Sequence, residues 1–203
     1  MNKKLVVLEG ISGAGKTTLA KLLKQRENNV DTVNIKISKL LENVEINNYI
    51  DYSNTKYYLL LENLKTIIFE DSKKDFVIYE RYYLSSLAHA YAMSKMNGMK
   101  KNYEDILKWY KTNIGDKIVK PDVYILLEIP TKLSIDRIKN RDDNTIVNDV
   151  WIDTEYMEIC ENYKLKFINK YEKEVPVYRI DGTQKIEKIY NEVIKILKLI
   201  HNN

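Results

Sequence analysis

The chain has 203 residues, with 33 lysines and arginines against 29 aspartates and glutamates, which gives a formal net charge of +4. Hydrophobic residues make up 44% of the sequence and there are only six glycines and three prolines, which excludes a largely disordered chain with long linkers. The single cysteine excludes an internal disulfide, and the lysines are spread along the chain without a basic block. We therefore expect a cytoplasmic protein of one domain, covering residues 1–203, that binds neither nucleic acid nor a membrane.

Five short runs of aliphatic and β-branched residues have the length and composition of buried strands. In chain order they cover residues 5–9, 33–37, 76–79, 123–128 and 177–180. Helical patterns separate the runs, and parallel neighbouring strands require crossover connections of that kind. The order therefore predicts an α/β fold with a doubly wound parallel sheet that has helices on both faces.

Apolar side chains recur at steps of three and four residues in four segments, as on one face of an α-helix. Two patterns lie in the first part of the chain: Tyr57, Leu60, Leu61, Leu64, Ile67 and Ile68, then Tyr103, Ile106, Leu107, Tyr110 and Ile114. Two more follow: Tyr156, Ile159, Cys160, Tyr163, Phe167 and Tyr171, then Ile186, Ile189, Tyr190, Val193, Ile196, Leu197 and Ile200. Each pattern predicts one amphipathic helix, and we interpret the last two stripes as core.

A glycine-rich segment follows the first predicted strand and matches G-x-x-x-x-G-K-[ST] from Gly10 to Thr17. Backbone N–H groups of such a loop surround phosphate oxygens, and the helix N-terminus adds partial positive charge. Lys16 is expected to reach the terminal phosphates and Thr17 to bind Mg²⁺. We predict that ATP is bound by Gly10, Ser12, Gly13, Ala14, Gly15, Lys16, Thr17 and Thr18. The motif predicts a nucleoside triphosphate with Mg²⁺ and leaves the phosphate acceptor open.

Charged residues next to the third and fourth strands are sorted by the end of the strand at which they stand. Ligands of a doubly wound sheet collect at the carboxyl ends of its strands. Glu80 and Arg81 follow the third strand and should face the phosphates, whereas Asp122 precedes the fourth strand and should lie at the far edge. Glu80 is a candidate for holding Mg²⁺ or accepting a proton, and Arg81 for clamping a transferring phosphoryl group. An ion pair between Glu80 and Arg81 is the structural alternative.

Two more arginines, Arg137 and Arg141, stand four residues apart at the end of a helix predicted to start near Thr131. That spacing places both on one helix face, beside a polar segment. Residues 137–150 are therefore a candidate lid whose arginines close over the phosphates and exclude water. The alternative is an ordinary solvated charged face.

Several segments resemble the thymidylate kinase branch of the P-loop nucleotide kinases. They are residues 7–10, which lead into the phosphate loop, 76–88, 121–127 with the arginines that follow, and 180–183. The resemblance implies a sheet of five parallel strands and a frequently dimeric protein, so a homodimer is a candidate assembly. It also implies that Arg81 contacts both the transferred and the acceptor phosphate, and that the arginines from 137 to 141 belong to a lid over ATP.

Three positions depart from the pattern of that branch. Ser12 stands where the phosphate loop usually has an acidic residue, and residues 35–39 read Ile-Lys-Ile-Ser-Lys where Arg-Glu-Pro is usual. The usual Asp-Arg pair is Glu80-Arg81, as in the related deoxynucleoside kinases. The catalytic glutamate of those kinases after the second strand has no clear match, because spacing does not select between Glu42 and Glu45.

These patterns predict an enzyme that transfers a phosphoryl group from ATP·Mg²⁺ to a nucleoside monophosphate, with dTMP to dTDP as the first choice. An acceptor phosphate is already ionised near neutral pH and needs little help from a general base, whereas a nucleoside hydroxyl must lose a proton. The first alternative is a deoxynucleoside kinase that uses Glu80 or another carboxylate as base. The second, from another class, is a regulatory module that binds a nucleotide without catalysis.

Overall fold

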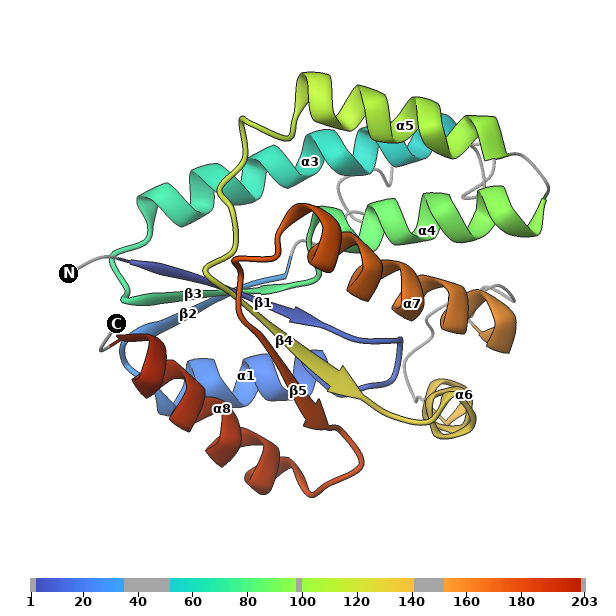
Figure 1. The fold of residues 1–203 in the computed structure, drawn as a ribbon. Coiled ribbons are helices and arrows are strands. Elements are labelled where there is room, and N and C mark those ends of the chain that lie inside the picture. The colour runs from blue at the N-terminus through green and yellow to red at the C-terminus, as the bar shows by residue number, and fades with distance from the viewer. Residues whose placement is uncertain (1–2, 35–51, 98–99, 141–151, 202–203) are drawn as a thin grey trace.

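The computed structural model describes residues 3–34, 52–97, 100–140 and 152–201. Its centre is a parallel sheet of five strands in the order β2-β3-β1-β4-β5 (Figure 1). The strands are β1 (Lys4–Glu9), β2 (Val30–Val33), β3 (Phe76–Glu80), β4 (Val123–Glu128) and β5 (Val177–Asp181). The predicted fold class, a doubly wound parallel sheet of five strands, is therefore confirmed.

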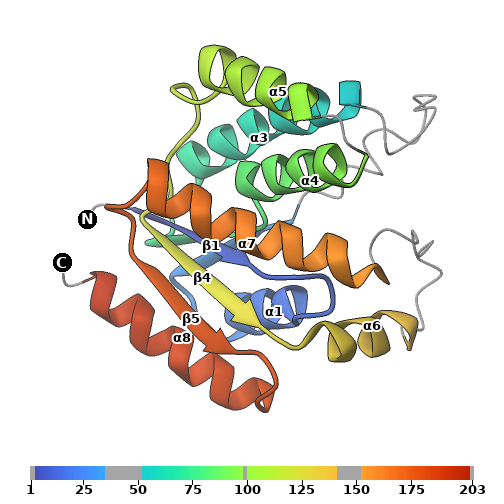
Figure 2. The same ribbon diagram turned by 45° about the vertical axis from the view of Figure 1, so that its right-hand side comes forward.

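Helices cover both faces of the sheet. The described helices are α1 (Lys16–Arg26), α3 (Tyr52–Asp71), α4 (Tyr83–Met96), α5 (Lys100–Asn113), α6 (Thr131–Lys139), α7 (Thr154–Tyr171) and α8 (Ile186–His201). Figure 2 shows α1 and α8 on one face, with α4 and α7 on the other and α3 and α5 beyond α4. No helix in these described parts has both the length and the apolar character needed to cross a bilayer.

The alternation of side chains along β1 divides the apolar residues into two cores. Leu5 and Val7 pack in the core that contains α4 and α7, whereas Val6 and Leu8 pack in the core that contains α1 and α8. Because both faces are covered, the strand needs apolar residues on both sides and reads as a continuous hydrophobic run.

The second strand lies earlier in the chain than the sequence pattern predicted. The prediction was residues 33–37, but β2 spans Val30–Val33 and pairs with β3 from Val30 opposite Phe76 to Val33 opposite Tyr79. Val30 and Val33 are buried, whereas the two polar residues between them are half-buried. An edge strand tolerates such residues, so the apolar run that we used as the signal missed its true start. Residues 35–37 lie outside the described parts of the chain.

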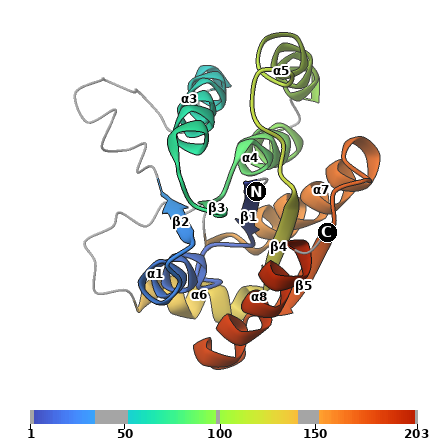
Figure 3. The same ribbon diagram turned by 90° about the vertical axis from the view of Figure 1, so that its left-hand side faces the viewer.

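Helix α3 is confirmed as a helix, but its apolar stripe faces outward. The exposed fractions of Tyr57, Leu60, Leu64, Ile67 and Ile68 range from 37% to 57%. The opposite face buries polar side chains, Glu62, Lys65 and Thr66, together with Leu59. Figure 3 shows α3 at the outer edge of the helical layer, beside α4 and α5. Its buried face contacts β3, where the Tyr79 hydroxyl donates a hydrogen bond to the Lys65 backbone carbonyl. The stripe is therefore a surface of the described fold, while the stripes of α7 and α8 are buried except at Tyr171, Ile186 and Tyr190.

The contact between α4 and α7 contains a titratable side chain. The His89 ring nitrogen Nδ1 lies 2.6 Å from the Tyr156 hydroxyl oxygen. Burial lowers the pKa of His89 to about 4. The imidazole is therefore neutral in the folded chain at pH values where an unfolded chain would already carry the proton.

This difference predicts a loss of stability in mild acid. The pKa of His89 is 6.5 in the unfolded chain and about 4 in the folded chain. Between these two values the unfolded state binds a proton and the folded state does not, so the free energy of unfolding falls as the pH falls. Burial of one histidine then costs about 2 kcal/mol between pH 7 and pH 4.5. Urea unfolding at both pH values should show a smaller loss for His89→Gln than for the wild type. Equal losses in the two proteins would contradict this assignment.

Candidate functional site

A cavity of about 530 Å³ opens at the carboxyl ends of the central strands. It is lined by most of the residues that the sequence singled out: Ser12, Gly13, Ala14, Gly15, Lys16, Thr17, Thr18, Glu80, Arg81 and Arg137. The remaining lining residues were not singled out as site residues: Asn34, Leu127, Gly182, Gln184, Ile186 and Ile189. Arg141 and most of the candidate lid, residues 141–150, lie outside the described parts of the chain.

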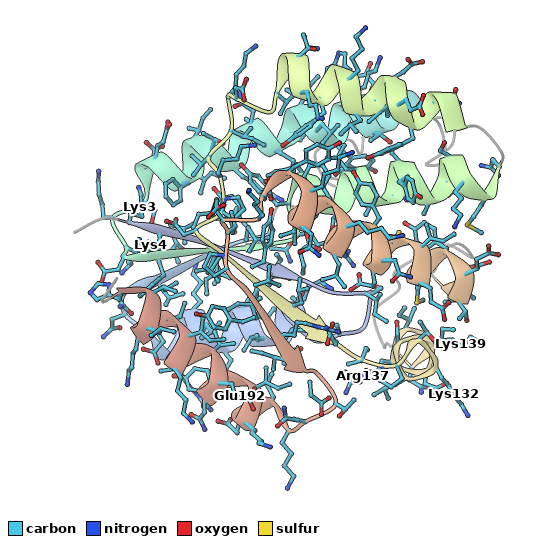
Figure 4. All side chains as sticks on the ribbon, viewed as in Figure 1. Lys3, Lys4, Lys132, Arg137, Lys139 and Glu192 are labelled. Atoms are coloured by element: carbon cyan, nitrogen blue, oxygen red, sulfur yellow. The ribbon has the colours of Figure 1, made fainter. Side chains whose placement is uncertain are left out.

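The opposite end of the sheet holds Asp122, as its position before a strand predicted. Its carboxylate accepts a hydrogen bond from the Leu5 backbone N–H at 2.7 Å and lies 3.7 Å from the Lys4 ammonium. Figure 4 shows Lys3 and Lys4 at that end of the molecule and Arg137 at the other. Asp122 therefore fastens strands and does not belong to the cavity.

The phosphate loop passes closest to neighbouring elements at two glycines. The backbone of Gly10 has a φ of 137° and that of Gly13 a φ of 79°, values that an L side chain rarely adopts. A Cβ atom on Gly10 would lie 2.4 Å from the Leu127 carbonyl oxygen, and one on Gly13 would lie 2.9 Å from the Ser134 carbonyl oxygen. The loop thus passes close to β4 and α6 before α1 begins at Lys16, which leaves the N-terminal amides of α1 beside the cavity.

The ammonium group of Lys16 is held by the loop itself. Its Nζ donates hydrogen bonds to the carbonyl oxygens of Gly10 and Ile11, each at 2.8 Å. Burial, together with the positive charges of Arg81 and Lys164, holds the pKa of Lys16 well below its ordinary value. A negative group in the cavity would relieve this repulsion, so the electrostatics favour an anionic ligand.

Two oxygen-bearing side chains meet beside Lys16. The Thr17 hydroxyl donates a hydrogen bond to Glu80 Oε2 at 2.5 Å. Glu80 is the last residue of β3, where the sequence pattern ended that strand one residue earlier. A hydroxyl and a carboxylate are hard ligands of the kind that Mg²⁺ binds together with phosphate oxygens and water. Within the described ranges, no group of three or more histidines, cysteines or acidic residues is placed so that it could hold a metal ion. A metal bound by Thr17 and Glu80 would therefore need further ligands from phosphate or water.

Arg81 has an unusual backbone. Among the described residues it is the only non-glycine with a positive φ, 64°. Its N–H donates to the Leu8 carbonyl at 3.0 Å, and its guanidinium Nη1 lies 3.3 Å from the Ser85 Oγ. Glu80 contacts Thr17 and Arg81 contacts Ser85, so these two neighbours do not form the ion pair that was the structural alternative. Such strained residues gather at functional sites, where the surrounding structure imposes them.

A buried carboxylate, that of Glu9, holds the Ser85 hydroxyl that Arg81 contacts. Glu9 is fully buried, and its carboxylate accepts hydrogen bonds from the Ser85 hydroxyl at 2.8 and 3.1 Å. The Lys164 ammonium lies 2.9 Å from Glu9 and 2.8 Å from Glu161. Burial alone would raise the pKa of Glu9, but Lys164 and Arg81 outweigh it and hold that pKa below its ordinary value. Glu9 therefore stays ionised.

Lys164 was missed as a site residue, although its spacing carried a signal. It follows Cys160 by four residues and precedes Phe167 by three, which places it on the core face of α7. A lysine at a core position is rare unless it is paired. That position therefore called for a buried acidic partner, which the structure identifies as Glu9.

Helix α6 is fastened to the phosphate loop. The Arg137 guanidinium donates to the carbonyl oxygens of Gly13 at 3.2 Å and Gly182 at 3.3 Å. The Ser134 hydroxyl donates to the Ser12 carbonyl oxygen at 2.5 Å. These contacts tie the base of the candidate lid to the backbone of the loop and to the end of β5.

Three comparisons place the chain among known proteins. A family model described as deoxynucleoside kinase matches residues 6–202. A probable thymidylate kinase 1 from Saccharolobus solfataricus is 27% identical over 208 residues, which cover 97% of each chain. Among solved structures, deoxyadenosine kinase from M. mycoides with bound dATP has a TM-score of 0.74 at 18% identity, covering 95% of this chain and 98% of that one. Thymidylate kinase from Candida albicans has a TM-score of 0.74 at 15% identity, covering 99% and 93%.

The tight passage of the loop at Gly10 predicts a stability effect. Gly10→Ala would place a methyl group against the Leu127 carbonyl at a backbone angle that alanine disfavours, so we expect a loss of about 3 kcal/mol or more in unfolding free energy. Gly115→Ala is the matched control, because its Cβ would find ordinary contacts of 3.5 Å or more. Denaturant unfolding compares the two, and similar stabilities for both variants would show that the loop can move away from β4.

Proposed function

This chain belongs to the deoxynucleoside kinase family, and from that premise we propose that it transfers the terminal phosphoryl group of ATP to a nucleoside monophosphate, dTMP first. The observation that carries the proposal is the lining of one cavity by Lys16, Thr17, Glu80, Arg81 and Arg137. A phosphate loop, a metal-binding pair and two guanidinium groups are what phosphoryl transfer between two anionic nucleotides requires.

The phosphate loop is the proposed site for ATP. The amides at the start of α1 and the ammonium of Lys16 would hold the β- and γ-phosphates, with Lys16 exchanging its bonds to Gly10 and Ile11 for phosphate oxygens. Thr17 and Glu80 would hold Mg²⁺, which neutralises charge on the phosphates when it is bound. Arg137 would add positive charge from α6.

Arg81 is the proposed contact to the acceptor. An acceptor phosphate oxygen attacks the γ-phosphorus, the bond to the bridging oxygen breaks in line with it, and ADP leaves with the electron pair. The guanidinium of Arg81 would hold both phosphates during this step, which a planar fork does better than a point charge. Its side chain is kept in place by Ser85.

The carboxylates near Arg81 favour a phosphate acceptor over a hydroxyl acceptor. Glu80 is bonded to Thr17, Glu9 is fully buried against Lys164, and Glu62 is paired with Lys65. Each of these described carboxylates is therefore engaged. An ionised phosphate needs no proton removed, so the reaction can proceed with the carboxylates so placed.

A deoxynucleoside kinase is the second candidate. It is favoured by Glu80 in place of the aspartate of thymidylate kinases and by the family to which the chain belongs. In that case Glu80, or a residue outside the described ranges such as Glu42 or Glu45, would take the proton of a sugar hydroxyl. The third interpretation, a regulatory module without catalysis, is set aside because the chain belongs to a family of kinases.

A coupled assay for ADP distinguishes the two candidates. The purified chain receives ATP and Mg²⁺ with one acceptor at a time: dTMP, dCMP, dAMP or dGMP in one series, thymidine, deoxycytidine, deoxyadenosine or deoxyguanosine in the other. We expect the highest kcat/KM with dTMP and no turnover above background with the nucleosides. Turnover confined to the nucleosides would replace this proposal with the second candidate.

We also propose that the chain forms a homodimer through the exposed stripe of α3. Five of the eight large apolar residues exposed in the described parts of the chain lie on this helix. A stripe at helical spacing can pack against its own copy about a two-fold axis. An antiparallel pairing would bring Lys56 near one end of α3 toward the acidic residues Glu70 and Asp71 at the other end of its partner.

A charge placed in the stripe should separate the protomers. Leu64→Glu puts a carboxylate in the middle of α3, where burial against a second copy would cost several kcal/mol. Leu199→Glu is the matched control, because Leu199 has a similar exposure on α8. Sedimentation velocity should give twice the chain mass for the wild type and the control, and one chain mass for Leu64→Glu. A monomeric wild type would rule out this assembly.

A further inference from the structure

A buried lysine on α3 holds the backbone carbonyl of Arg81. The Lys65 Nζ donates a hydrogen bond to the Arg81 carbonyl oxygen at 2.9 Å. Lys65 is only 4% exposed, and its Nζ lies 2.7 Å from Glu62 Oε2, whose residue is 3% exposed. Lys65 and Glu62 therefore form a buried ion pair next to the strained backbone of Arg81.

The environment of Lys65 restricts where its ammonium can point. The Nζ lies 5.7 Å from the centre of the Tyr79 ring and 5.5 Å from that of Tyr82, the residues on either side of the Glu80-Arg81 dipeptide. Burial raises the pKa of Glu62 while the charge of Lys65 opposes that rise. A buried ion pair seldom stabilises a fold more than apolar residues of the same size would. The pair therefore calls for an explanation other than stability.

The conformation of Arg81 supplies that explanation. A left-handed backbone is strained for a non-glycine residue and persists only where its neighbours impose it. The Arg81 N–H is fixed on the Leu8 carbonyl, and the Arg81 carbonyl is fixed on Lys65. With both ends of the residue held, its side chain leaves the strand end toward Ser85 and the cavity.

We propose that Lys65 is a positioning residue, which holds the strained backbone of Arg81 so that its guanidinium faces the transferring phosphoryl group. The proposal rests on the phosphoryl transfer proposed above. Lys65 touches neither ATP nor the acceptor in this account and acts only through Arg81. Without the bond to Lys65, the Arg81 carbonyl is free to turn, the backbone relaxes to a negative φ and the guanidinium leaves its place.

The test removes the donor without leaving an unpaired buried charge. The double variant Glu62→Gln/Lys65→Met keeps the side-chain volumes and is neutral at both positions. We expect its kcat with ATP and dTMP to fall about tenfold or more, because small misplacements of a reacting group are costly, while the KM for ATP stays within about twofold. Glu62→Leu/Lys65→Leu, which also has no donor at residue 65 and no charge at either position, is the second variant should this double variant not fold.

A double-mutant cycle separates positioning from general damage. In an Arg81→Ala background, loss of Lys65 should change kcat by less than about twofold, because the residue through which it acts is already gone. The proposal would be overturned if loss of Lys65 lowered kcat by the same factor with and without Arg81. It would also be overturned if loss of Lys65 left kcat unchanged in the protein that retains Arg81. Lys3→Met is the control: Lys3 also donates to backbone carbonyls at the end of α3, those of Glu70 and Ser72, but far from the cavity.

A second measurement does not depend on turnover. The Arg81 amide, bonded to the Leu8 carbonyl, should exchange its hydrogen faster in the double variant than in the wild type. Unchanged exchange would also overturn the proposal. A wild-type protein that transfers phosphate to no acceptor would instead contradict the proposed function, and the exchange rate would still show whether Lys65 anchors Arg81.

Discussion

The arrangement of the site depends on the contacts that the buried carboxylate of Glu9 makes. Glu9 ends β1 directly before the phosphate loop, so its position fixes where the loop begins. Its oxygens accept a hydrogen bond from the Ser85 hydroxyl at the start of α4, and they form an ion pair with the Lys164 ammonium of α7. One ionised group thus joins the loop, the Arg81 segment and the helix that follows the candidate lid. Because it lies away from water, each of these contacts is stronger than it would be at the surface.

Residues close to one another in sequence could be predicted, and residues that meet only in the fold could not. The loop from Gly10 to Thr17 and the strand end at Glu80 carry local signals, since a motif or a hydrophobic run is complete within a few residues. Lys65 carries no signal that separates it from a solvated lysine. The spacing of Lys164 indicates a core position, but it does not identify Glu9 as the partner. The outward stripe of α3 was equally hidden, because periodicity reveals that a helix has two faces but not which face the fold buries.

Positively charged side chains line the cavity, and buried ion pairs lie next to one of them, Arg81. Lys16 and Arg137 line the cavity, and both bond to backbone carbonyls of the phosphate loop. Arg81 is held between two buried lysine–glutamate pairs, one on α3 and one formed by β1 and α7. An anion that enters therefore meets positive groups already held at the cavity, and Lys16 would exchange its carbonyl partners for the anion. Helix α3 contributes to this arrangement from its buried face while its other face carries the apolar stripe.

Every role proposed for these residues requires that the phosphate loop bind a nucleoside triphosphate together with Mg²⁺. Titration calorimetry of the purified chain with ATP tests it directly, once with Mg²⁺ and once with the metal removed by a chelator. We expect saturable binding of one ATP per chain that weakens markedly without Mg²⁺, because Thr17 and Glu80 would then have no ion to hold beside the phosphates. Absence of detectable heat with ATP or GTP in the presence of Mg²⁺ would contradict it.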